Sequence, residues 1–421
     1  MAAGMTAETH AAIDAVWRIE SPKIIATLTR ITRDIGVAED LAHDALVSAL
    51  EQWPDAGIPK NAGAWLMAAA KNRAIDHLRR GKMLDRKHDE LGQDLEHRQS
   101  AAAQAIEAAL DDDVGDDMLR LIFTACHPVL SAEARVALTL RLVGGLTTDE
   151  IARAFLVPEP TIAQRIVRAK RTLAKEQVPF ELPRGADRTE RLSSVLEVIY
   201  LIFNEGYAAT AGGDWMRPAL CEDALRLGRV LAELTPRDAE VHGLVALMEL
   251  QASRMRARVG HSGEPVLLLE QDRSRWDRLL IRRGLAALAR ADQLTDIRGP
   301  YTLQAAIAAC HARARTAQET DWTRIAALYA VLAHILPSPI VELNRGVAIG
   351  MAFGPAAGLE VVDPLADEPS LRHYHLLPSV RGDLLAKLGR RDEARAEFER
   401  AASLTQNTRE RELLLARAAG V

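Results

Sequence analysis

The side chains best suited to chemistry lie on one side of a predicted helix, within the stretch Leu146–Leu173. Four apolar residues recur there at steps of four, three and four, which predicts one buried stripe: Ile162, Ile166, Ala169 and Leu173. The opposite side carries hydroxyl, amide and cationic groups: Thr161, Gln164, Arg165, Arg168, Arg171 and Lys175. Such groups contact phosphates and base edges in the major groove of DNA. The pattern therefore predicts a helix with its back in a core and its front on DNA.

A shorter helix is predicted directly before this one. Thr147 or Thr148 can cap it, and acidic residues occupy its first turn, near the positive end of the helix dipole. Pro158 ends it, and Pro160 suits the first turn of the next helix, where a missing N–H costs nothing. The pair is typical of a helix-turn-helix, although an exposed amphipathic hairpin with a basic face would show a similar pattern.

Composition favours helices and hides a strong segregation of charge. Of the 421 residues 48% are hydrophobic and only 4% aromatic, and the formal net charge is -5. Residues 60–88 nevertheless hold eight basic residues against two acidic ones, whereas residues 89–117 hold ten acidic residues against one basic residue. Two basic patches separated by an acidic spacer fit nucleic-acid binding better than the net charge suggests.

Cysteine usage and hydropathy exclude several classes of protein. Cys126, Cys221 and Cys310 lie far apart with no CxxC pair, so we expect three reduced, buried thiols and no disulfide framework. We expect no metal and no cofactor. The sequence shows no run of eighteen apolar residues and no signal-peptide pattern, so we expect a cytoplasmic protein without a membrane partner.

The chain divides into helical segments, which predicts an all-α fold. Residues 8–82 form a first helical module whose last helix is expected to end at Gly81, and residues 83–114 form an acidic linker. A second module, residues 115–178, ends in the helix-turn-helix, and residues 187–421 look like successive helix pairs. The last pair, with Gly382, a turn at Gly389 and Phe398, is typical of a tetratricopeptide repeat; an irregular helical domain is the alternative.

Three stretches together resemble an extracytoplasmic-function (ECF) sigma factor of the sigma-70 family. These are GVAEDLAHDALVSALEQWP, GAWLMAAAKNRAIDHLRR, and LRLIFTACHPVLSAEARVALTLRLVGGLTTDEIARAFLVPEPTIAQRIVRAKRTL. VIYLIFNEGYAAT and VELNRGVAIG resemble the subgroup with a fused C-terminal tetratricopeptide-like domain. The resemblance implies a subunit without catalysis of its own. It would bind the β′ clamp helices and the β flap of bacterial core RNA polymerase, contact the promoter and lie at the nucleoid when so bound.

The resemblance also assigns roles to particular residues. The polymerase-binding candidates are Glu39, Asp40, Leu41 and Asp44, for which a solvated helix start is the alternative. The candidates for the -10 promoter element are Asn61, Lys71, Asn72, Arg79 and Arg80, and a solvated basic face is the alternative. The candidates for the -35 element are Thr148, Thr161, Gln164, Arg165, Arg168 and Arg171. Trp65 could stack on a base, but its place on the apolar stripe favours packing.

The C-terminal half offers a weaker functional signal. Asn204, Glu205 and Tyr207 are polar residues in an apolar run, which indicates either a regulatory pocket or a helix cap at Gly206. We expect this half to bind a protein or a small molecule and to modulate the sigma modules, with the acidic linker lying on their basic faces. A stand-alone helix-turn-helix regulator with a helical-repeat domain is the main alternative, and a pure interaction scaffold is a further one.

Overall fold

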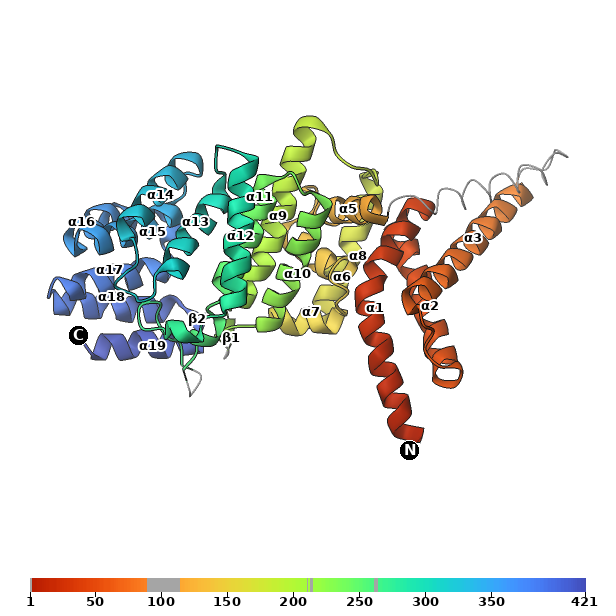
Figure 1. The fold of residues 1–421 in the computed structure, drawn as a ribbon, viewed down its shortest axis with the longest axis horizontal. Helices are drawn as coiled ribbons and strands as arrows, with labels where there is room; N and C mark the ends of the chain where they lie inside the picture. The colour runs from red at the N-terminus through yellow and green to blue at the C-terminus, as the bar shows by residue number, and fades with distance from the viewer. Residues whose placement is uncertain (1, 89–113, 210, 213–214, 261–263) are drawn as a thin grey trace. The chain divides into compact units, whose positions relative to one another are not determined.

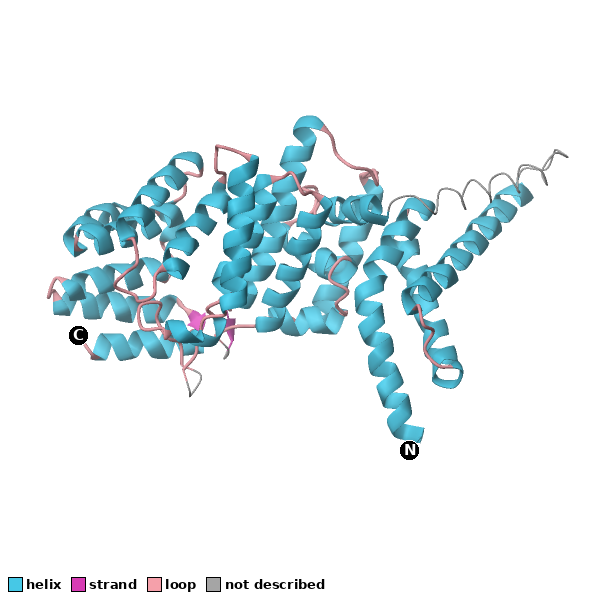
Figure 2. Ribbon diagram, viewed as in Figure 1, coloured by secondary structure: helices cyan, strands magenta, loops and turns pink. Residues whose placement is uncertain are grey.

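The computed structural model describes residues 2–88, 114–209, 211–212, 215–260 and 264–421. Helices make up most of the described chain, as Figure 2 shows, so the prediction of an all-α fold is confirmed. The chain forms two compact units, Met1–Val198 and Ile199–Val421, with the division inside α9. Most of the predicted acidic linker, residues 89–113, lies outside the described residues.

Unit 1 contains two groups of helices, of which residues 2–88 form the first group and residues 114–198 the second. The helices are α1 (Ala2–Thr32), α2 (Ile35–Ala56), α3 (Ala62–His88), α5 (Val114–Ala125), α6 (Ala132–Leu142), α7 (Thr148–Phe155), α8 (Glu159–Lys175) and the first part of α9 (Gly185–Tyr207). The helix α3 continues past Gly81, where the sequence predicted its end. A glycine inside a helix costs only about 1 kcal/mol, and the residues that follow Gly81 are mostly good helix formers.

The helix-turn-helix forms where the sequence predicts it. Thr147 caps α7 through a capping box, accepting from the Glu150 amide at 3.1 Å and donating its own amide to the Glu150 carboxylate at 2.8 Å. The left-handed backbone of Leu156 (φ 51°) turns the chain between the helices. Pro160 lies in the first turn of α8. Local signals thus account for both helix ends.

Unit 2 is a succession of helices, and Figure 1 shows neighbours in sequence lying side by side. The helices are the end of α9, α10 (Pro218–Leu234), α11 (Ala239–Ala252), α12 (Arg278–Leu294), α13 (Pro300–Arg313), α14 (Trp322–Ile335), α15 (Pro339–Phe353), α16 (Pro355–Val362), α17 (Leu376–Lys387), α18 (Arg391–Leu404) and α19 (Thr408–Ala419). Four short 3-10 helices separate some of them: Met255–Ala257, Arg273–Arg275, Asp363–Asp367 and Pro369–Leu371.

The α17–α18 pair explains the small residue that the sequence places at 382. A Cβ on Gly382 would lie 2.9 Å from the ring of Phe398, which is itself buried. Gly389 forms the turn between the helices with φ +76°, a conformation that favours glycine. Around this contact the pair builds a core that includes Leu377, Leu384 and Ala401.

The start and the end of unit 2 are joined by a short parallel pairing. The strand β1 (Ala211–Gly212) pairs with β2 (Gln406–Asn407). The buried Asn407 side chain donates to the Ala209 carbonyl at 3.1 Å. None of the helices in the described part of the chain combines the length and the apolarity needed to cross a bilayer.

Candidate nucleic-acid interface

The two sides of α8 separate as the sequence predicts. Its four apolar residues are all buried: Ile162, Ile166, Ala169 and Leu173. Gln164, Arg168 and Arg171 are exposed, and Thr161 and Arg165 are half-buried. Within the described residues, no carboxylate forms an ion pair with the three arginines of this helix. A helix that presents guanidinium groups outside ion pairs, together with an amide, is suited to phosphates and base edges.

The helix α7 contributes less to this face. Thr148 is half-buried at the first position of α7, next to the capping residue Thr147. Arg153 pairs with Asp149 one turn earlier at 2.7 Å, and both side chains are exposed. The α7 surface is therefore partly neutralised, and the cationic character of the helix-turn-helix comes from α8.

The helix α3 places its candidates differently. The side-chain oxygen Oδ1 of Asn61 accepts from the Ala64 amide at 3.1 Å, so this side chain caps α3. Asn72 and Arg79 are exposed, Lys71 is half-buried, and the Arg80 side chain lies outside the described residues. Trp65 packs edge-on against the buried Trp53 with ring centroids 5.3 Å apart, which is the packing role favoured for it.

The polymerase-binding candidates on α2 divide into two pairs. Asp40 and Asp44 are exposed, and Asp44 lies 3.5 Å from Arg73 of α3. Glu39 and Leu41 are buried, and the side chains of Glu39 and its neighbours meet the second group of helices. A partner can therefore reach only the two aspartates while this arrangement lasts.

Glu39 is the centre of an ion-pair network that we call the Glu39 cluster: Glu39, His43, Arg141 and Lys170. Glu39 is only 4% exposed and accepts from Arg141 of α6 at 2.7 Å and from Lys170 of α8. His43 Nδ1 lies 2.8 Å from the Glu39 carbonyl, and its Nε2 lies 2.9 Å from an Arg141 nitrogen. Both distances fit a neutral imidazole that donates from Nδ1 and accepts at Nε2. The cluster joins the helix α2 to the cationic helix α8.

Electrostatics favour the charged form of Glu39 despite its burial. Burial by itself raises the pKa of this carboxyl, but the charges and hydrogen bonds of Lys170 and Arg141 outweigh it and hold the pKa below 4.5. A buried carboxylate needs such partners, because without them it would lose the stabilisation that water provides. Separating α2 from α6 and α8 therefore requires a replacement for both cations.

Two further ion pairs join the same groups of helices. Arg18 of α1 donates to Glu150 of α7 at 3.0 Å. Arg30 of α1 donates at 2.8 Å to Asp117 of α5, whose side chain is buried and also accepts from Arg120. The contact thus has polar links at three places, and one of them uses the capping residue Glu150 of the helix-turn-helix.

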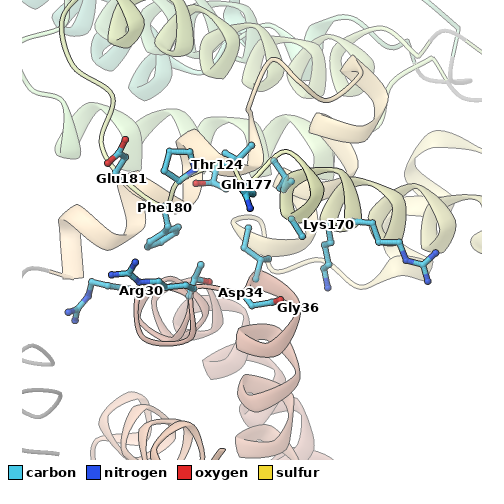
Figure 3. A pocket seen from close by; sticks show the side chains of 16 residues that line it. Arg30, Asp34, Gly36, Thr124, Lys170, Gln177, Phe180 and Glu181 are labelled. Carbon is cyan, nitrogen blue, oxygen red and sulfur yellow. The ribbon is translucent and has the colours of Figure 1, made fainter. Parts of the chain in front are cut away.

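A groove of about 990 Å³ lies beside the Glu39 cluster. Figure 3 shows Arg30, Asp34 and Gly36 on one side and Gln177 and Phe180 on the other. Lys170 also lines the groove, so one of the two cations on Glu39 borders open space. Access of water to this cation lowers the energetic cost of breaking its pair with Glu39.

Sequence reasoning missed the partners of Glu39. Arg141 and Lys170 lie 102 and 131 residues from Glu39 along the chain. Lys170 falls among the basic residues of α8, so its type and position predict only another solvated or DNA-facing cation. No local spacing could have identified either pairing.

Two polar residues of the FNEGY stretch have partners elsewhere in unit 2. Glu205 pairs with Arg217, and the Tyr207 hydroxyl accepts from Arg254 at 2.5 Å. Asn204 is exposed. A Cβ on Gly206 would lie 2.7 Å from the Cys221 amide, so this glycine lets α10 approach α9 closely. The packing at Gly206 gives this stretch a structural role.

All three cysteines are buried and unpaired with one another. Burial raises the pKa of the Cys126 and Cys221 thiols to about 12, so neither forms a reactive thiolate near neutral pH. The expectation of buried thiols is confirmed for these residues.

Family models match both groups of helices in unit 1. Residues 17–83 match the family model of sigma-70 region 2, and residues 120–173 match that of sigma-70 region 4. Residues 191–292 match a family of unknown function, DUF6596. Glu39 and His43 thus lie in sigma-70 region 2, whereas Arg141 and Lys170 both lie in region 4.

Individual relatives extend the comparison. An uncharacterized protein of Rhizobium meliloti is 43% identical over 390 residues, which cover 92% of this chain and 91% of that protein. The probable ECF RNA polymerase sigma factor SigI of Mycobacterium tuberculosis is 27% identical over 171 residues, 40% of this chain and 57% of SigI. The RNA polymerase sigma-H factor of Pseudomonas aeruginosa is 27% identical over 159 residues, 38% of this chain and 82% of its own.

Proposed function

We propose that this chain, which belongs to the ECF group of the sigma-70 family, binds core RNA polymerase through α2 and selects promoters through α3 and α8. It is a sigma factor that directs transcription. The proposed role of α8 in promoter contact rests on its two sides. Its apolar side is buried, whereas Gln164, Arg168 and Arg171 on the other side are exposed. The protein then works in the cytoplasm, at the nucleoid.

The promoter contacts divide between the two modules. Arg165 and Arg168 lie three residues apart on α8 and are proposed to contact bases or phosphates of the -35 element, with Thr148, Thr161, Gln164 and Arg171 beside them. On α3, Lys71, Asn72, Arg79 and Arg80 are proposed to contact the -10 element, and Asn61 caps the helix that carries them. Phosphate contacts of this kind make the affinity depend strongly on salt.

The Glu39 cluster supports a closed form of the free protein. Glu39 and Leu41 are proposed to contact the β′ clamp helices together with Asp40 and Asp44, yet both are buried in this conformation. Polymerase binding would then require Arg141 and Lys170 to release Glu39. The same release frees α8 from α2, so polymerase binding and promoter recognition through α8 become coupled. The helix α8 is proposed to lie near the β flap.

Unit 2 is proposed to be a tetratricopeptide-like domain that modulates the sigma modules through a protein or small-molecule partner. The packing of Gly382 against Phe398 supports the repeat assignment for the last helix pair. Tyr207, one of the candidates for a regulatory pocket with Asn204 and Glu205, contacts Arg254 at the end of α11.

Run-off transcription with purified bacterial core polymerase on a pooled promoter library tests the function. Transcripts that depend on this protein are expected, and they would reveal both promoter elements. Arg165→Ala should weaken promoter binding by about 1–3 kcal/mol, as expected for the loss of one base contact. Arg184→Ala is the control, because this exposed arginine follows the helix-turn-helix. Equal promoter affinity of Arg165→Ala and wild type would contradict the assignment of α8.

Truncation tests the modulating role of unit 2. The cut should follow Tyr207, because the first half of α9 packs within unit 1: Ser194 donates to the Cys126 carbonyl at 2.6 Å and Arg191 to that of Phe123 at 3.0 Å. Promoter-dependent transcription should change when residues 208–421 are absent. Unchanged transcription would remove the modulating role and leave the sigma function intact.

The stand-alone helix-turn-helix regulator remains the alternative. It predicts salt-dependent binding to duplex DNA without any association with core polymerase. Co-purification with core would exclude it, whereas DNA binding without co-purification would favour it.

A further inference from the structure

A small cavity lies in unit 2 between α11, α13 and α14. Its volume is about 180 Å³, and leucine, isoleucine and alanine side chains form much of its wall. Five polar side chains also line it: Gln251, Arg254, Gln304, His311 and Tyr329. Small-molecule sites combine apolar walls with polar groups that orient the ligand.

Arg254 belongs to a group of three guanidinium groups around this part of unit 2. Arg254 donates to the Tyr207 hydroxyl at 2.5 Å and to Gln251, and its guanidinium lies 5.7 Å from the centre of the Trp276 ring. Arg258 lies 3.6 Å over the ring of Tyr207, and Arg273 donates to the His311 carbonyl at 2.6 Å.

No carboxylate is ion-paired with these three cations in the described part of the chain, and Glu319 is a longer-range anionic neighbour of Arg273. Their hydrogen bonds go to carbonyl, hydroxyl and amide oxygens. Arg258 and Arg273 are buried, so solvent compensates their charges poorly. Positive charge therefore accumulates beside the cavity, where Arg254 reaches its wall.

Two other polar groups of the cavity lining also lack partners. His311 is 9% exposed, and its Nδ1 is buried without a hydrogen bond. Burial, and then the charges of Arg254 and Arg273, lower the pKa of His311 to about 3, so the imidazole is neutral. The Tyr329 hydroxyl has no hydrogen-bond partner among the described side chains and backbone groups. The buried Nδ1 of His311 is costly to leave without a partner unless a ligand satisfies it.

We propose that this cavity binds a small carboxylate with a short apolar body, and that Arg254 holds the carboxylate. A cavity of about 150 Å³ accommodates benzene, so this cavity has room for one ring or a branched chain. A guanidinium matches a carboxylate in geometry and charge, and the unsatisfied groups of His311 and Tyr329 are suited to hydrogen bonds with the ligand. The inference does not rest on the proposed function in transcription.

Calorimetric titration of the full-length protein with benzoate and isovalerate tests the proposal, with benzamide as the neutral isostere of benzoate. At least one carboxylate should bind at or below about 10 mM, and benzoate should bind about tenfold more tightly than benzamide. Arg254→Gln should weaken binding about tenfold or more, whereas Arg256→Gln should leave it unchanged, because Arg256 is an exposed arginine two residues away.

A second variant, which fills the cavity, keeps the test valid if Arg254→Gln fails to fold. Ala308→Leu adds volume to the wall and keeps every polar group, so it should abolish binding while the thermal unfolding of the protein stays cooperative. Absence of binding by both carboxylates would overturn the proposal. Equal affinity of wild type, Arg254→Gln and Ala308→Leu would overturn it as well, because the ligand would then lie elsewhere.

Discussion

Replacing Arg141 with glutamine should raise the affinity of this sigma factor for core polymerase. Arg141 donates to the Glu39 carboxylate at 2.7 Å and to the Leu146 carbonyl at 3.2 Å, and lies 2.9 Å from His43 Nε2. It is not among the residues proposed to bind polymerase or DNA. The substitution therefore weakens the closed form and leaves both proposed interfaces intact.

The size of the effect follows from the burial of the two partners. A hydrogen bond to a charged group contributes about 1.5–3 kcal/mol. The Arg141 side chain is 21% exposed, and Lys170 keeps its pair with Glu39, so the expected loss lies at the lower end, about 1.5 kcal/mol. For a protein that is mostly closed, this loss converts into about tenfold tighter binding to core.

Titration of fluorescently labelled core polymerase measures this affinity. Arg153→Gln is the matched control, because Arg153 pairs only with Asp149 on its own helix within the described region and both are exposed. Glu39→Gln separates the two roles of Glu39: it opens the cluster and also removes a proposed polymerase contact, so it should bind less tightly than Arg141→Gln. Unchanged or weaker binding by a folded Arg141→Gln protein would refute the closed form.

Three further predictions concern pH, the helix cap and the repeat core. The pKa of Glu39 is lowered in the closed form, so this form is stabilised when the carboxyl is ionised and loses stabilisation as pH falls through the lowered pKa. Spin labels on α2 and α8 should therefore move apart in acid in wild type, and an acid-induced change of the same size in Glu39→Gln would contradict this. Thr147→Ala should lower the free energy of unfolding by about 1 kcal/mol in urea titrations, whereas Thr148→Ala, which keeps the capping box, should not. Gly382→Ala should lower the free energy of unfolding by about 1–2 kcal/mol, because its Cβ meets the Phe398 ring at 2.9 Å. Gly420→Ala is the control, because a Cβ there has no contact below 3.5 Å. Equal stability of the two variants would show that the ring can move away.

Local features of α7 and α8 were predictable because they depend on residues close in sequence. The apolar stripe of α8 requires only the helical period, and the capping box of α7 requires only Thr147 and Glu150. The end of α3 was not predictable from Gly81 alone, because one glycine weakens a helix less than the following residues stabilise it. Short-range signals thus determined the type of element more reliably than its end.

The sequence by itself determined an all-α chain with a basic helix-turn-helix and a family resemblance that names its partners. Only the tertiary structure decided that Glu39, a polymerase-binding candidate by sequence, is buried between Arg141 and Lys170. It alone also brought Arg254, His311 and Tyr329 to one cavity from three different segments. The physical reason is the same in both cases: side chains far apart in sequence meet only when helices pack, and neither charge nor spacing along the chain specifies which helix packs on which.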